Sequence, residues 1–128
     1  MQIKRDQYAE IYPAGPTYTR GVRAGNVLYI SGTTSRGSDA KTPMDQLRVV
    51  LDRVTRIVEA EGGTSSNIVK MTTFLTDKSD WWPICEEQQE IWWDFFQGNY
   101  PANAYLEVKG LATDDLLVEI ETIAILDD

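Results

Sequence analysis

The sequence predicts an α+β fold in which a mixed β-sheet is covered on one face by two helices. Residues 43–61 repeat apolar side chains at three- and four-residue spacing, as an amphipathic helix does. Residues 116–125 read as a β-strand, in which successive side chains point to opposite faces of a sheet. The expected elements follow the order strand, strand, helix, strand, helix, strand, strand, and such an order favours a single sheet with two helices on it.

Two strands are expected near the start of the chain. Residues 18–23 lead through the turn at Ala24-Gly25-Asn26 into residues 27–32, a run rich in β-branched and aromatic side chains. Residues 33–42 are polar and contain glycine, so we expect them to form a loop.

The first helix is the clearest element of the sequence. Pro43 lies near its start, and Gly62-Gly63 stops it. Its apolar stripe, which we expect to pack on the sheet, consists of Leu47, Val50, Leu51, Val54, Ile57 and Val58.

A third strand is expected at residues 68–75, followed by a second helix. Asp77 or Ser79 is expected to cap this helix, with Pro83 in about its first turn and an end near Gln97.

Two closing strands are expected at residues 104–108 and 116–125. Both faces of the last strand carry apolar side chains, whereas two helices cover only one face of a sheet. The other face therefore needs a partner, and closed symmetric self-association is the usual solution. Nothing divides the chain internally, so residues 1–128 are expected to form one domain.

Composition excludes several classes of function. The net charge is −8 and the acids are spread along the chain, which argues against partners with phosphate backbones or anionic membrane surfaces. No apolar run approaches the ~18 residues of a membrane helix, and the charged N-terminus has no apolar stretch behind it. A cytoplasmic protein that binds neither nucleic acid nor membrane is expected.

The chain has no histidine and one cysteine, Cys85, which we expect to be buried or half-buried in the second helix. Serine–histidine and cysteine–histidine catalysis are therefore excluded, and a zinc site lacks its usual ligands. No metal is expected. Any chemistry has to depend on carboxylates, hydroxyls, backbone groups and bound water.

Two tryptophan pairs stand out in so small a chain. Trp92 and Phe96 are four residues apart and share a helix face, and the same spacing relates Trp81 to Cys85. One ring of each tryptophan pair is therefore expected in the core, while the other faces a second subunit or a partner protein.

Five segments, in this order, resemble the Rid (YjgF-like) family. They are the tyrosine-bearing residues 15–22, the strand end at residues 27–32, the strand IVKMTTFLTD at residues 68–77, the YPA motif at residues 100–102 and the strand VEIETIA at residues 118–124. The resemblance implies a chorismate-mutase-like fold and a homotrimer with clefts between its subunits. It also implies a metal- and cofactor-independent deaminase, a hydrolase that converts reactive imines and enamines such as 2-aminoacrylate to keto acids and ammonia.

The resemblance also assigns roles to residues of this chain. It implies that Tyr18 lines the cleft, that Ser31 and Gly32 border the substrate, and that Glu119 holds the attacking water. Glu119 is either a carboxylate beside an apolar cleft, with a raised pKa that suits water activation, or the outward polar position of an alternating strand.

The departure from the family concerns its catalytic arginine, which is expected after the YPA-type motif. Asn103 stands there, so a bidentate, charge-assisted clamp on a substrate carboxylate is lost. Tyr105 lies two residues on and shares the strand face of Asn103. A more aromatic, less cationic pocket with specificity altered from 2-aminoacrylate is therefore expected.

Arg20 is a candidate for the missing cation, because it lies two residues from Tyr18 and so points to the same side. It either clamps a substrate acid from another direction or is a solvent-exposed surface arginine. Three functions remain open: a hydrolase of a small C–N compound, a non-catalytic trimer that binds a metabolite or a partner enzyme, and another acid–base reaction such as isomerisation. A pocket beside Glu119 that holds a water favours the first over the second.

Overall fold

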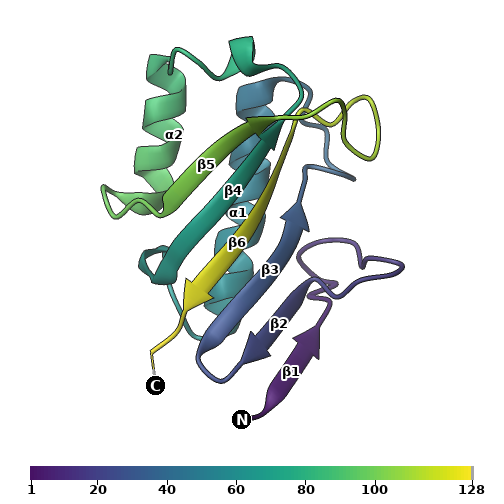
Figure 1. Ribbon diagram of the computed structural model, residues 1–128, viewed down its shortest axis with the longest axis vertical. Helices are drawn as coiled ribbons and strands as arrows, with labels where there is room; N and C mark the ends of the chain where they lie inside the picture. Colours follow the sequence, from purple (N-terminus) through teal and green to yellow (C-terminus); the bar gives the residue numbers. More distant parts are fainter. Residues whose placement is uncertain (128) are drawn as a thin grey trace.

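The computed structural model describes residues 1–127 and confirms the α+β class with a mixed sheet. The strand order across the sheet is β1-β2-β3-β6-β4-β5; neighbours are antiparallel except β4 and β5, which are parallel. Figure 1 shows α1 behind the sheet, with α2 beside it near the β5 edge. The elements are β1 (Ile3–Asp6), β2 (Gly21–Ala24), β3 (Val27–Thr33), α1 (Pro43–Ala60), η1 (Ser65–Asn67), β4 (Ile68–Leu75), η2 (Lys78–Asp80), α2 (Glu86–Phe96), β5 (Ala102–Glu107) and β6 (Val118–Ile125).

Helix α1 forms as its sequence predicts. The Thr42 hydroxyl accepts a hydrogen bond from the backbone N–H of Asp45 (3.1 Å), and Pro43 occupies the first turn, where a missing N–H costs nothing. Every residue of the predicted apolar stripe is fully buried (0% exposed), and the stripe forms part of the core.

The two faces of the sheet have different surroundings. The face under the helices is buried, and its side chains include Leu28, Ile30, Met71, Thr73, Val118 and Ile120. The opposite face leaves Tyr29 and Ile125 exposed, along with the half-buried Ile123. The predicted alternation of β6 is therefore confirmed, and its open face carries apolar groups without a cover from this chain.

Strand β1 was not predicted, because residues 3–6 are mostly charged and exposed. They form an edge strand that pairs only with β2, where charged side chains are tolerated. The expected strand over residues 18–23 is shorter than predicted: β2 begins at Gly21, and residues 18–20 are part of the preceding loop.

The predicted start of the second helix is wrong. Asp77 accepts from the Ser79 N–H (3.0 Å) and caps the short η2, while α2 begins only at Glu86 with Cys85 as its N-cap. Cys85 is consequently exposed rather than buried, and it shares no helix with Trp81. Pro83 lies ahead of the helix.

The tryptophan pairs divide as predicted. Trp81 and Trp92 are buried, whereas Trp82 is 70% and Trp93 56% exposed. Trp92 also stacks on Phe96 with 5.6 Å between ring centroids, which confirms their common helix face. In the described residues 1–127, no helix is long and apolar enough to cross a membrane.

A polar cluster around Glu61 ties the β1–β2 edge to the end of α1. The Glu61 carboxylate accepts hydrogen bonds from Lys4 Nζ (2.7 Å), Tyr8 Oη (2.7 Å) and Arg23 Nη1 (3.3 Å), and its side chain is only 3% exposed. Burial alone would raise the pKa of Glu61, but these three donors lower it below its ordinary value of 4.5.

Glu61→Gln is expected to lower the free energy of unfolding at pH 7 by about 1–3 kcal/mol, because buried charge-assisted hydrogen bonds are lost. A carboxylate with a depressed pKa contributes stability above its unfolded value and loses it as the pH falls through the folded value. The difference between the two proteins should therefore shrink as the pH falls below the ordinary value of 4.5, and vanish below the lowered pKa of folded Glu61. Urea unfolding at one protein concentration and several pH values checks this, with the exposed Glu59→Gln as control. An unchanged difference at low pH would contradict it.

Candidate active site

The first half of the candidate site is built around Glu119 on the open face of the sheet. A pocket of about 480 Å³ is lined there by side chains from the first loop, from β3 and its following loop, and from β6. We call it the Glu119 pocket; its lining includes Tyr12, Tyr18, Ser31, Gly32, Arg36 and Glu119. All four residues that the resemblance predicts for the cleft, which are Tyr18, Ser31, Gly32 and Glu119, line this pocket.

A β-bulge places Ser31 and Gly32 in this pocket. Ile30 pairs with Thr122 and Thr33 with Ile120, so two residues of β3 face one of β6. The Ser31 hydroxyl donates to the Thr19 carbonyl (2.6 Å), which fixes the bulge to the preceding loop.

Glycine at position 32 lets the Glu119 carboxylate lie against the backbone. A Cβ atom added there would clash with Glu119 Oε2. The φ angle of Gly32 lies outside the left-handed region, so space rather than backbone conformation explains the glycine.

Burial and neighbouring charges shift the pKa of Glu119. Burial raises the pKa of this half-buried carboxyl; the charge of Arg20 opposes the rise, and that of Glu121 adds to it. A carboxylate with a raised pKa takes a proton from water more readily than an ordinary glutamate does.

Arg20 is not the surface arginine that was one of its two alternatives, because it is fully buried. It donates to the carbonyls of Gly32 (3.1 Å) and Pro13 (3.2 Å) and to Tyr18 Oη (3.4 Å). Its guanidinium therefore supports the wall of the Glu119 pocket from behind, and its side chain does not line that pocket.

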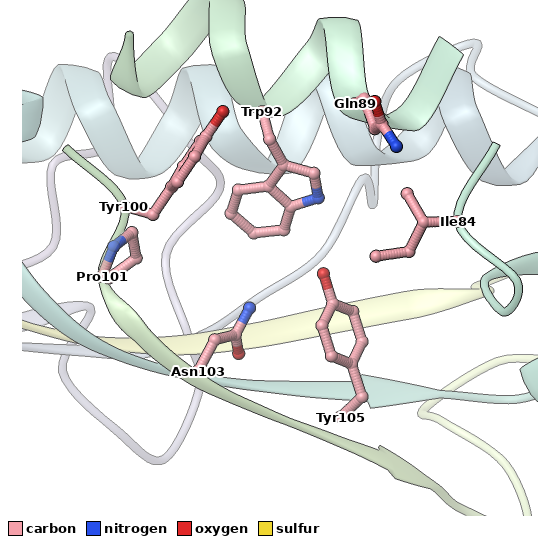
Figure 2. A pocket seen from close by; sticks show the side chains of 7 residues that line it. All are labelled: Ile84, Gln89, Trp92, Tyr100, Pro101, Asn103 and Tyr105. Carbon is pink, nitrogen blue, oxygen red and sulfur yellow. The ribbon is translucent and has the colours of Figure 1, made fainter. Parts of the chain in front are cut away.

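The second half of the candidate site lies between β5 and α2. Figure 2 shows Asn103 and Tyr105 projecting from β5 toward Trp92 and Gln89 of α2. They line a pocket of about 390 Å³ with Ile84, Tyr100 and Pro101, which we call the Asn103 pocket. Its walls are largely aromatic and contain no charged side chain, as the sequence led us to expect.

Three polar groups line or adjoin the Asn103 pocket, namely the Trp92 indole, the Tyr105 hydroxyl and the Asn103 amide. The Trp92 indole N–H is buried and has no partner of standard hydrogen-bond geometry within residues 1–127, but the Tyr105 hydroxyl lies close to it. Burial raises the pKa of Tyr105, so its hydroxyl is protonated at neutral pH. Asn103 Oδ1 already accepts from Thr73 Oγ1 (3.0 Å), which leaves its amide N–H groups for other partners.

The two pockets lie on opposite faces of the sheet. Tyr105 pairs with Thr73, which is buried under the helices, and Asn103 shares that face. Glu119 pairs with Phe74, the next residue of β4, whose side chain points to the open face. Asn103 and Glu119 of one chain therefore do not face one another.

Sequence reasoning missed Tyr12 and Arg36, both of which line the Glu119 pocket. Tyr12 is buried and exchanges hydrogen bonds with Thr34 through its hydroxyl (2.7 and 3.1 Å). Nothing in the sequence marks these residues, because they come from two irregular segments that only the fold brings together. Within residues 1–127, no group of three or more carboxylate or thiol side chains is arranged to hold a metal ion.

The family is decided by comparison with known proteins. The family model described as Endoribonuclease L-PSP matches residues 8–126. The solved structure of YyfA from Yersinia pestis, of the conserved Rid protein family, has a TM-score of 0.84 at 26% identity and covers 98% of this chain and 100% of its own. The chain belongs to this Rid (YjgF) family.

Other Rid relatives match this chain over most of their own length. A RutC family protein of Pyrococcus horikoshii is 34% identical over 117 residues, which is 88% of each chain. RidA from the Antarctic bacterium Psychrobacter has a TM-score of 0.76 at 31% identity, covering 88% of this chain and 91% of its own. The chorismate-mutase-like arrangement expected from the sequence is thereby confirmed, and membership supports a small-molecule deaminase or binding role.

Proposed function

We propose that this chain is a Rid-type hydrolase that deaminates a small imine, enamine or related C–N compound, with specificity altered from 2-aminoacrylate. The observation that carries the proposal is that Glu119, half-buried and with a raised pKa, opens onto a pocket of about 480 Å³. A water occupies roughly 30 Å³, so this pocket has room for a water and a small substrate. This feature favours a hydrolase over a protein that only binds.

The reaction follows from the groups present. Ionised Glu119 accepts a proton from water as the water oxygen attacks the carbon of the C=N bond, and then passes this proton to the nitrogen, which restores the carboxylate. The resulting carbinolamine then collapses: Glu119 moves the hydroxyl proton to the nitrogen, the C–N bond breaks, ammonia leaves and a carbonyl forms. Tyr18 and Ser31 border the reacting carbon in this proposal. An enamine is first protonated on carbon to give the imine.

We further propose that the active cleft forms between subunits of a homotrimer. Asn103 and Glu119 lie on opposite faces of one sheet, so two copies are needed to bring both pockets onto one small ligand. The open face exposes Tyr29, Leu106 and Ile125, each at least 39% exposed, which suits coverage by other copies. The Asn103 pocket would then supply aromatic contacts and the Trp92 and Tyr105 donors.

The alternatives make different predictions. A non-catalytic trimer that binds a metabolite or a partner enzyme would leave imines unhydrolysed, and an isomerase would release no ammonia. The endoribonuclease of the family description is not part of our proposal, because a chain of net charge −8 suits a polyanionic partner poorly. We expect action in the cytoplasm, without metal or cofactor.

Subunit mixing is the experiment that tests the shared cleft. Glu119→Gln chains and Tyr105→Ala chains, each expected to be poorly active alone, are unfolded, mixed in equal amounts and refolded together. In a random trimer, a cleft receives an intact Glu119 pocket and an intact Asn103 pocket from two different chains in about a quarter of cases. Ammonia release from a panel of small imines should therefore recover to about a quarter of the wild-type rate.

The mass of the protein is the control for this experiment. Light scattering should give three times the 14.5 kDa of one chain for the wild type and for both variants. A stable monomer, or mixed samples no more active than their components, would contradict the shared cleft while leaving the chemistry of Glu119 to be tested separately.

A further inference from the structure

The Asn103 pocket has aromatic walls and no charged side chain among the residues that line it. Trp92, Tyr100 and Tyr105 border a space of about 390 Å³, and Asn103 projects toward the same space from β5 (Figure 2). Pockets of this size hold small organic molecules. Because aromatic faces offer a large apolar contact to a flat group, these walls suit a planar ring or a planar amide.

The Asn103 amide presents donors, not acceptors, to this space. Its Oδ1 atom accepts a hydrogen bond from Thr73 Oγ1 at 3.0 Å, and Figure 2 shows its nitrogen on the side of Trp92. Thr73 is fully buried under the helices, so this contact fixes which end of the amide faces the pocket. The N–H groups of Asn103 Nδ2 are therefore available to an acceptor atom of a ligand.

The Tyr105 hydroxyl adds a second donor to the same pocket. Burial raises the pKa of Tyr105, and the nearby Gln88 and Trp92 side chains offset part of the rise, as donors to the phenolic oxygen do. An indole N–H only donates, so the hydroxyl proton of Tyr105 points away from Trp92. A ligand in the pocket therefore meets an O–H donor as well as the N–H groups of Asn103.

The surroundings of the pocket disfavour a charged ligand. Helix α2, which forms one wall, carries four acidic side chains and no basic one; these are Glu86, Glu87, Glu90 and Asp94, all exposed. A carboxylate in the pocket would be repelled by this helix and would find only neutral donors. A cation would face the positive ends of the N–H and O–H groups. An uncharged group with an acceptor oxygen satisfies both constraints.

We propose that the Asn103 pocket binds an uncharged planar group with a carbonyl oxygen, as in an amide or a lactam, and that the substrate of this chain is a neutral carbonyl compound. The carbonyl oxygen accepts from Asn103 Nδ2 and Tyr105 Oη, while the plane of the group packs on the aromatic walls. This inference rests on the hydrolase proposed above and names its substrate class. Glu119 of a neighbouring subunit would then act on a C–N bond of the same molecule.

Three ligands of nearly equal shape test this inference: benzamide is neutral, benzoate is an anion and benzamidinium is a cation. Calorimetry gives the Kd of each ligand for the full chain, and the NMR signals of the indole N–H and the asparagine side chains report the site. Benzamide should bind to the wild type at least ~10-fold more tightly than either charged ligand, because the buried charge would lack a partner.

Asn103→Asp is the most informative variant, because it keeps the size and the bond from Thr73 while it replaces the N–H donors by a charged acceptor. Benzamide binding should weaken about 5- to 100-fold, the effect of leaving a polar group unpaired, and benzamidinium should become the preferred ligand. Asn99→Asp, at an exposed position outside the pocket, is the matched control and should bind all three ligands like the wild type. Tyr105→Phe keeps the ring, and it should weaken benzamide binding about 2- to 10-fold.

The possible outcomes separate this inference from the proposed function. Benzoate or benzamidinium as the tightest ligand of the wild type, or no benzamide binding at millimolar concentration, would overturn the inference even if Glu119-dependent ammonia release is found. Benzamide binding that neither Asn103→Asp nor Tyr105→Phe weakens would overturn it as well. Selective benzamide binding that depends on Asn103, without ammonia release from any imine, would support the inference and contradict the hydrolase.

Discussion

Glu119→Gln is expected to reduce turnover about 10²- to 10⁴-fold while the protein stays folded and assembled. Glutamine keeps the size and much of the hydrogen bonding of glutamate, but it does not accept a proton, so the loss isolates the work of a base on water. The measurement is the rate of ammonia release from the imine of the panel that the wild type hydrolyses fastest, beside circular dichroism and light scattering of each variant.

The pH dependence gives a second readout of the same residue. In the proposed mechanism Glu119 is a base only when ionised, so the wild-type rate should fall as the pH drops through its raised pKa, above the range of an ordinary glutamate. The residual rate of Glu119→Gln should lack this acidic limb. Glu121→Gln, two residues along the same face and more exposed, is the matched comparison and should lose far less. Reversed effects of the two substitutions would assign the water to Glu121.

Gly32→Ala is expected to lower the rate by roughly 10²-fold, because displacing a catalytic group by about 1 Å costs on that order. The added methyl group meets the Glu119 carboxylate, which has to move off the bulge or push β3 away from β6. Alanine is compatible with the backbone at position 32, so the loss should appear in kcat with little change in the urea midpoint.

Gly110→Ala provides the control for this substitution. A Cβ atom at position 110 meets nothing within 4 Å, so its rate and stability should match wild type. A Gly32→Ala protein with full activity would show that the contact between Gly32 and Glu119 does not position the carboxylate for catalysis.

The elements that sequence predicts well are those whose pattern is long. The stripe of α1 spans about three turns and the alternation of β6 spans eight residues, so a few atypical residues do not obscure either period. Short elements fail for the opposite reason. Strand β1 has four residues that are mostly charged, and its existence depends on pairing with β2 and on the Lys4–Glu61 contact, which are both distant in sequence.

In the candidate site too, residues on long periodic strands are predictable from the sequence, whereas residues in irregular segments are not. Periodicity places Asn103 and Tyr105 on one face of β5 and Glu119 on one face of β6, and both placements hold in the structure. The relation between the two faces depends on strand order, which has no local signal. Arg36 lies in the mostly polar loop between β3 and α1, and only the fold brings it next to Tyr12 and into the Glu119 pocket.

The division of the tryptophan pairs gives the chain an optical probe of its own site. Trp92 is buried against the Asn103 pocket, and Trp81 is buried nearby, whereas the rings of Trp82 and Trp93 face solvent. Indole emission shifts to longer wavelength in water, so the intrinsic fluorescence is a sum of a blue component from the core and a red component from the surface. A soluble quencher such as iodide suppresses mainly the red one. The remaining signal then comes from rings that include a wall of the pocket, which makes unlabelled protein suitable for ligand screening.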